Sequence, residues 1–204
     1  MKVSDWHMDL IFPTPVWWGD TNIDRASLKK LALKLKKEDP QGRFVSNIGG
    51  WQSHDLTSAT HPELKDLEKV ILEQASRCLV DYGFCLESGY LEISNFWINI
   101  NYLKDLNVSH FHHGSFVSGV YYIEAEESQG EILFQKNNAE AFIVCSSAGP
   151  FIERTHLSKD EQAYIVKPGR IIMFPSSLVH RVAGNETDRP RISISWNVRY
   201  KEYS

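Results

Sequence analysis

The stretch LEISNFWININ at residues 91–101 decides the expected fold, because its side chains change character with a period of two. The apolar members are Phe96, Ile98 and Ile100, and they alternate with Trp97, Asn99 and Asn101. Successive side chains of a β-strand point to opposite faces of its sheet, so this pattern predicts a strand. Further candidate strands, separated by Gly, Asn, Pro and Ser, follow at 115–124, 130–135, 162–167, 169–175 and 191–200.

The residues before this stretch predict two helices and one edge strand. Leucines share one face of residues 24–37 among lysines, with Asp24 near the start, which is typical of an amphipathic helix. A second helix is expected over about 60–82, where Thr60-His61-Pro62-Glu63 matches a capping box with proline in the first turn. Two prolines limit the apolar residues 10–18 to an edge strand, which could pair across a homodimer.

Several short strands after two helices predict a mainly β protein, an antiparallel sandwich or barrel with the helices packed outside it. A chain of 204 residues suits one domain, and no linker divides it. We therefore expect residues 1–204 to form a single domain, with helical support over about 1–85 and a β core over about 90–204. Residues 136–160 are expected to be a long loop, either a functional lid or a connector without a role.

The composition excludes several classes of partner. Lys and Arg number 22 against 26 Asp and Glu, a net charge of −4, so there is no basic surface for nucleic acid or for an anionic membrane. No apolar run approaches a membrane span, and the N-terminus lacks a signal-peptide core. The three cysteines have no metal-type spacing and are expected to be free thiols. These features predict a soluble, cytoplasmic protein.

The densest cluster of titratable side chains is His110-Phe111-His112-His113. On an extended strand, His110 and His112 point to the same face and can aim their imidazoles at one metal ion. A solvated histidine run at a strand end explains the same residues, so the cluster alone leaves both interpretations open. His180, which follows a predicted buried strand at 169–175, is the third candidate ligand.

The strand expected at 191–200 carries Arg191, Ser193, Ser195 and Asn197 on one face. Four polar residues facing a barrel interior would be costly unless something there accepts their hydrogen bonds. A cosubstrate carboxylate is the natural candidate, because arginine grips a carboxylate with two charge-assisted bonds. The opposite orientation, with Ile192, Ile194 and Trp196 in the core and the polar residues in water, is equally compatible with the pattern.

The order H-x-H, then a glycine-containing strand pair, then F-P-x-x-x-x-H, then R-x-S resembles the iron- and 2-oxoglutarate-dependent oxygenases of double-stranded β-helix (jelly-roll, cupin-like) fold. The segment HFHHGSFVSGVYY at 110–122 resembles a small bacterial and phage subfamily of these oxygenases more closely. Thr14-Pro15-Val16 and Gly49-Gly50-Trp51-Gln52-Ser53 also look like motifs of that subfamily. The resemblance thus spans nearly the whole chain.

The resemblance implies a role for each matched residue. His110 and His180 match the two iron histidines, and Arg191 matches the arginine that binds the distal carboxylate of 2-oxoglutarate, with Ser193 as its R-x-S partner. Tyr122 matches a tyrosine that prolyl hydroxylases use toward the same carboxylate. His112 stands where most of these enzymes carry Asp or Glu. This departure implies a three-histidine iron(II) site and leaves the identity of the metal less constrained.

The implied activity is a dioxygenase that consumes 2-oxoglutarate and dioxygen, releases succinate and CO2, and hydroxylates a small molecule or a peptide side chain. Two alternatives stay open. A cupin-like metal enzyme also uses H-x-H and a later histidine, but it usually has a glutamate three or four residues after H-x-H, where this chain has Ser115 and Phe116. The other alternative is a metal-free ligand-binding barrel.

Overall fold

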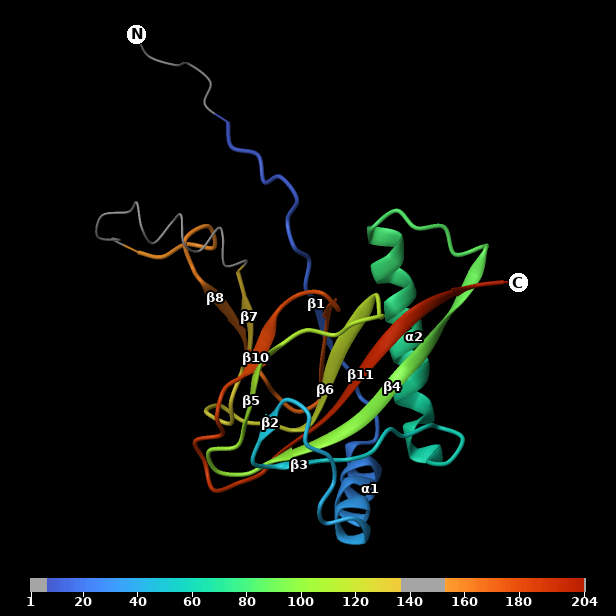
Figure 1. The fold of residues 1–204 in the computed structure, drawn as a ribbon, viewed down its shortest axis with the longest axis vertical. Coiled ribbons are helices and arrows are strands. Elements are labelled where there is room, and N and C mark those ends of the chain that lie inside the picture. Colours follow the sequence, from blue (N-terminus) through green and yellow to red (C-terminus); the bar gives the residue numbers. More distant parts are fainter. Residues whose placement is uncertain (1–6, 137–152, 204) are drawn as a thin grey trace.

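A computed structural model of the chain describes residues 7–136 and 153–203 (Figure 1). The described strands form two antiparallel sheets, with the orders β1-β9-β6-β11-β4-β3 and β2-β5-β10-β7-β8. The first sheet contains β1 (Trp17–Asp20), β3 (Trp51–Gln52), β4 (Gly89–Asn101), β6 (Val117–Glu124), β9 (Arg170–Pro175) and β11 (Arg191–Glu202). The second sheet contains β2 (Asn47–Ile48), β5 (Leu106–His110), β7 (Ile132–Gln135), β8 (Glu161–Tyr164) and β10 (His180–Val182). The expected antiparallel β architecture is confirmed.

Two helices, α1 (Arg25–Glu38) and α2 (Lys65–Asp81), lie on the outer face of the six-stranded sheet (Figure 1). Their leucines and isoleucines pack in one cluster with the apolar side chains of β4 and β11, among them Ile98, Ile194 and Trp196, all fully buried. Each such side chain contributes about 2 kcal/mol by leaving water. This cluster holds the central strands in place, and it confirms that the helices pack outside the β core.

The other face of β11 points into the space between the two sheets. Arg191 and Ser193 are buried there, although their neighbours Ile192 and Ile194 are buried on the helix side. The sequence pattern left open whether the polar or the apolar face of this strand is buried, and the structure buries both. Both faces of β11 are covered because the strand lies between a helical layer and a second sheet, and only the polar face meets the cavity.

A two-glycine turn carries the chain from one sheet to the other. β2 belongs to the five-stranded sheet and β3, which follows directly, to the six-stranded sheet. Gly49 and Gly50 have φ of 69° and 66°, where residues with a side chain are strained. A Cβ at Gly49 would also lie 2.0 Å from Oδ1 of Asp105. Glycine is therefore required where the chain crosses beside β5.

The two helices begin differently. Asp24 caps α1 as expected, and its Oδ1 accepts hydrogen bonds from the backbone N–H groups of Ala26 and Ser27 at 3.0 and 3.3 Å. The capping box expected at Thr60 is wrong, because the hydroxyl of Thr60 donates to the carbonyl of Thr57 within a preceding turn. The second helix instead opens with a 3₁₀ turn, Pro62–Leu64, which leads into α2.

The edge strand is shorter than expected. β1 begins at Trp17 and pairs with β9 at the edge of the six-stranded sheet, and residues 10–16 form no strand. Pro13 and Pro15 lack the N–H groups that a ladder needs, and Phe12 has a positive φ of 57°. Most of the loop expected at 136–160, with Cys145, lies outside the described residues, so its two interpretations stay open.

Candidate metal and cosubstrate site

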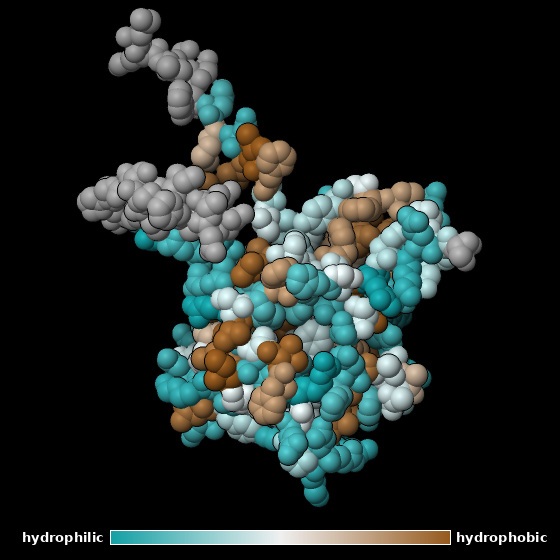
Figure 2. All heavy atoms as spheres, viewed as in Figure 1, coloured by the Kyte–Doolittle hydropathy of each residue, from teal (hydrophilic) through white to brown (hydrophobic). Residues whose placement is uncertain are grey.

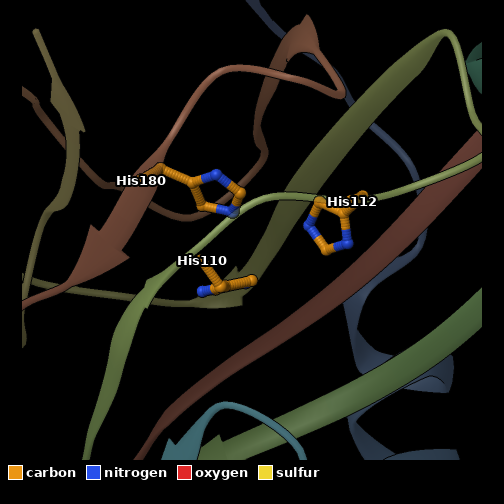
Figure 3. Close-up of side chains that lie close together, drawn as sticks. All are labelled: His110, His112 and His180. Atoms are coloured by element: carbon orange, nitrogen blue, oxygen red, sulfur yellow. The ribbon is translucent and has the colours of Figure 1, made fainter. Parts of the chain in front are cut away.

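Three histidines from different segments converge in the structure (Figure 3). His110 at the end of β5 and His180 at the start of β10 are paired directly across the two strands. His112 lies two residues beyond His110, and its ring is 5.1 Å from that of His110 and 5.2 Å from that of His180. One ring nitrogen of each histidine lies within 4.8 Å of the others, so a single metal ion can contact all three.

His112 reaches this point by a different route from the one predicted. β5 ends at His110, so strand alternation does not align the two rings. Instead the backbone N–H of His112 donates to the carbonyl of Ser176 at 2.8 Å, which ties the segment after β5 to the end of β9. Trp97 lies on β4, on the opposite wall, and its ring centroid is 5.9 Å from that of His112.

The surroundings of the rings suit neutral ligands. Nδ1 of His110 lies 2.7 Å from the carbonyl oxygen of Val108, and Nδ1 of His180 lies 2.9 Å from that of Leu178. A proton on each Nδ1 satisfies these contacts and leaves Nε2 as the ring nitrogen that could bind a metal. Burial lowers the pKa of His110, brings that of His112 to about 4 and that of His180 to about 3. All three imidazoles are therefore uncharged at neutral pH, as metal binding requires.

The three histidines line a cavity of about 370 Å³ between the two sheets. The inward side chains of the six-stranded sheet form rows in this cavity, because paired residues of neighbouring strands lie opposite one another. In order along β11, the rows are Arg191 with Asn101, Ser193 with Tyr122 and Asn99, Ser195 with Val120 and Trp97, and Asn197 with Ser118 and Asn95. The sequence-predicted residues Arg191, Ser193 and Tyr122 thus occupy the first two rows together.

Arg191 is a buried cation, 2% exposed, without an ion pair among the described residues. Its Nη1 donates to the carbonyls of Gln129 and Gly130, and its Nε has no partner within residues 7–136 and 153–203. Burial lowers its pKa, and the charges of Tyr122, Glu131 and Asp105 offset this desolvation only in part. Arg191 lines the cavity, and a buried guanidinium with an unused N–H can bind the carboxylate of an acid there.

Tyr122 and Ser193 stand opposite each other on β6 and β11, one row from Arg191. Burial raises the pKa of Tyr122 to about 12, so its hydroxyl stays protonated and can donate a hydrogen bond. Its neighbour Tyr121 points the other way, into the cluster beneath the helices. The donors of these two rows therefore fit the carboxylate expected at Arg191.

Sequence reasoning missed the wall that β4 contributes. Asn101, 2% exposed, lines the cavity, and its Oδ1 accepts no hydrogen bond from the described residues. Asn99, Trp97 and Asn95 line the same cavity. The signal was present, because Trp97, Asn99 and Asn101 form the polar half of the same period-two alternation that identified the strand. The polar face of this strand therefore predicts a second polar wall, as the polar face of the Arg191 strand does.

The remaining histidines that the structure describes lie elsewhere. His7, His54 and His156 are exposed, and His54 faces Asp39 at 3.6 Å. His113 points to Phe111, with 4.4 Å between their ring centroids. Within residues 7–136 and 153–203, the group of histidines and acids that can share a metal is the one formed by His110, His112 and His180.

Comparison with known families agrees with this geometry. The family described as "Putative 2OG-Fe(II) oxygenase" matches residues 95–197, just over half of the 204-residue chain. The chain therefore belongs to this family: it is an oxidoreductase of the oxygenase class that uses iron(II) and 2-oxoglutarate. This membership sets aside the metal-free barrel and the cupin-like enzyme. A comparison with curated protein sequences found no match.

Solved structures of similar shape identify the fold as the double-stranded β-helix of these oxygenases. The non-heme α-ketoglutarate-dependent epimerase SnoN from nogalamycin biosynthesis has a TM-score of 0.63 at 14% identity, over 93% of this chain and 77% of SnoN. A Trichoplax adhaerens prolyl hydroxylase has a TM-score of 0.61 at 15% identity, over 92% of this chain and 83% of the hydroxylase. A Pseudomonas putida prolyl-4-hydroxylase has a TM-score of 0.58 at 12% identity, over 91% of this chain and 93% of the hydroxylase. At these identities the similarity shows the fold alone.

No helix in the described part of the chain is both long and apolar enough to cross a membrane.

Proposed function

We propose that this oxygenase hydroxylates a C–H bond of a small molecule or a peptide side chain, with His110, His112 and His180 as the iron ligands. The observation that carries the proposal is the arrangement of one cavity. Three neutral imidazoles converge on one of its walls, and on the facing sheet stands a buried arginine that forms no ion pair with the residues the structure describes. An ion at the histidines and a dicarboxylate reaching from it to Arg191 would satisfy both groups.

The residues of the first two rows would hold the cosubstrate. Arg191 would donate its unused Nε–H to the distal carboxylate of 2-oxoglutarate, and Tyr122 and Ser193 would add hydroxyl donors from the next row. When bound, iron(II) and 2-oxoglutarate supply the chemistry in which dioxygen, 2-oxoglutarate and R–H become R–OH, succinate and CO2. The protein's own part is to orient these groups and to keep bulk water from the reacting centre.

The neutral state of the ligands bears on the metal. Three imidazoles bring no negative charge, so a bound divalent ion keeps its full charge and attracts the anionic cosubstrate strongly. Arg191 adds a second positive charge in the same cavity. The site as a whole therefore favours a doubly charged anion such as 2-oxoglutarate.

Succinate formation tests the proposal. The full chain is incubated with iron(II), 2-oxoglutarate and dioxygen without a substrate, and slow uncoupled release of succinate is expected. The matched control is a double variant, His110→Ala with His180→Ala, which removes two ligands. Succinate no higher than that of the double variant, or undiminished succinate after Arg191→Ala at low 2-oxoglutarate, would contradict the assignment.

A further inference from the structure

A polar row at the far end of the cavity from Arg191 is not used by the metal or the cosubstrate. It consists of Asn197 and Asn95, which line the cavity, and of Ser118, which is buried and is paired with Asn197 across β6 and β11. We call these three residues the amide row. Ser118 Oγ donates to Oδ1 of Asn197 at 2.8 Å, and Nδ2 of Asn197 donates to Oδ1 of Asn95 at 3.2 Å. Nδ2 of Asn95 in turn donates to Asp55 at 3.3 Å.

This chain of hydrogen bonds fixes both amides in one orientation. A carboxylate can only accept a hydrogen bond, so Asp55 requires the NH2 of Asn95 to face it. The oxygen of Asn95 then faces the NH2 of Asn197. Oδ1 of Asn95 also accepts from Ser94 Oγ at 3.5 Å, so Asn95 keeps one N–H for another partner, whereas Asn197 keeps one N–H and one oxygen lone pair. The row is therefore a preorganised surface that can both donate and accept.

The amide row lies on the His112 side of the cavity. Along β11, Asn197 is six residues from Arg191, which is about 20 Å of extended strand. The Ser118 hydroxyl is 2.7 Å from that of Ser176, whose carbonyl anchors the N–H of His112. A group bound at this row would thus lie beside the metal ligands and away from the cosubstrate rows.

The charges near the amide row are already paired. Arg43 and Asp55 both line the cavity, and Nη1 of Arg43 lies 3.4 Å from Oδ2 of Asp55. A phosphate or a free carboxylate would compete with Asp55 for Arg43, and a free ammonium would compete with Arg43 for Asp55. The group that matches two fixed, uncharged amides is another amide, which offers one N–H and one carbonyl.

Apolar side chains surround the same cavity at the surface. Val45, Val108 and Phe111 line it and are 66%, 42% and 45% exposed. Figure 2 shows apolar side chains gathered over β2 and β5, and these three residues belong to or adjoin those two strands. A ligand that follows the amide row outward would therefore place apolar groups against these three residues.

We propose that the amide row binds a backbone amide of an uncharged peptide segment whose apolar side chains rest on Val45, Val108 and Phe111. The substrate of the oxygenase is then an internal stretch of a peptide or protein. This inference rests on the proposed function, because the peptide must lie beside the iron ligands to be oxidised. Free amino acids and nucleotides fit this row less well, because their charges would have to displace the ion pair between Arg43 and Asp55.

Binding to an inert form of the whole chain tests the inference. The protein is loaded with nickel(II) and 2-oxoglutarate without dioxygen, and the probe is a pool of capped tetrapeptides built from uncharged residues. Ligand-observed NMR identifies the binder, and calorimetry gives its Kd. We expect Asn95→Ala and Asn197→Ser each to weaken the peptide about tenfold, as the loss of one buried hydrogen bond does. Gln162→Ala removes an exposed amide on β8 and should change nothing.

The outcomes separate this inference from the proposed function. Titration of 2-oxoglutarate into the nickel protein and its Arg191→Ala variant tests the proposed function alone. Normal 2-oxoglutarate binding with no capped peptide bound would overturn the inference and leave the function standing. Equal peptide affinity in wild type, Asn95→Ala and Asn197→Ser would also overturn it. Parallel pools of monosaccharides and uncharged nucleosides complete the test. Tighter binding of either class than of the capped peptides would overturn the assignment of a peptide to this row.

Discussion

Arg191 and Asn101 face each other across the β11–β4 ladder, and each has a buried polar atom, Nε and Oδ1, that forms no hydrogen bond in the described part of the chain. Unpaired buried polar atoms are rare because each costs about 1–3 kcal/mol. Two of them in one row of a cavity indicate a polar ligand at that position. The amide of Asn101 can present its NH2 to a carboxylate by a half turn about its terminal bond.

Asn101→Asp should weaken 2-oxoglutarate strongly. The new carboxylate would pair with Arg191 and repel the distal carboxylate, and a like charge at this distance costs several kcal/mol, roughly 100-fold in Kd. Calorimetric titration of the nickel-loaded protein measures the effect. Asn95→Asp, six residues along β4 from Asn101, places the same charge in the same cavity about 20 Å away and serves as the control. An Asn101→Asp protein with wild-type affinity would remove Asn101 from the carboxylate site.

Replacing each histidine of the cluster separately tests whether three ligands hold the metal. His110→Ala, His112→Ala and His180→Ala should each lower metal affinity about 100-fold or more, since altering even the partners of ligands costs 10–100-fold. His112→Asp, which restores a carboxylate ligand, should keep stoichiometric metal. Metal content after gel filtration is the measurement, and the exposed His54→Ala is the control. Full metal content in His112→Ala would reduce the site to two protein ligands.

Gly119→Ala should destabilise the fold. A Cβ at Gly119 would lie 2.5 Å from Cζ2 of Trp196 and 2.8 Å from the carbonyl oxygen of Ile172, inside the packed sheet. Overpacking of this kind costs typically 1–3 kcal/mol. Gly19→Ala is the matched control, because a Cβ there meets nothing within 4 Å and should change stability by less than about 0.5 kcal/mol. Urea unfolding compares the two, and equal midpoints would show that the sheet adjusts freely.

Asp20 should make the attachment of β1 depend on pH. Hydrogen bonds from Arg170 and Lys167 lower the pKa of Asp20 from 3.8 to about 2. A carboxyl group whose pKa is lower in the folded than in the unfolded state stabilises the fold at pH values above its unfolded-state pKa. This stabilisation is lost as the pH falls through the folded-state pKa. The difference in urea midpoint between wild type and Asp20→Asn should therefore be full at pH 6 and shrink between about pH 4 and pH 2. A constant difference over that range would show that Asp20 carries no linked proton.

Much of the fold and part of the site could be predicted from the sequence. The period-two alternation of residues 91–101 and the apolar face of residues 24–37 identify a strand and a helix because each pattern is local. The short strands β2, β3 and β10 were not predicted, because a segment of two or three residues is too short to show a period. The capping box at Thr60 failed for a related reason, because a neighbouring turn engages the same hydroxyl.

By itself, the sequence determined the chemistry of the candidate site: imidazoles at 110, 112 and 180, a guanidinium at 191, and strands that alternate polar with apolar side chains. Only the tertiary structure decided which of these groups meet. His112 joins the cluster through a hydrogen bond to Ser176, 64 positions away, and not through strand alternation. Register between distant strands also places Asn101 beside Arg191 and builds the amide row. The physical reason is that side-chain type and local period are encoded residue by residue, whereas register and layer packing depend on contacts between segments far apart in the chain.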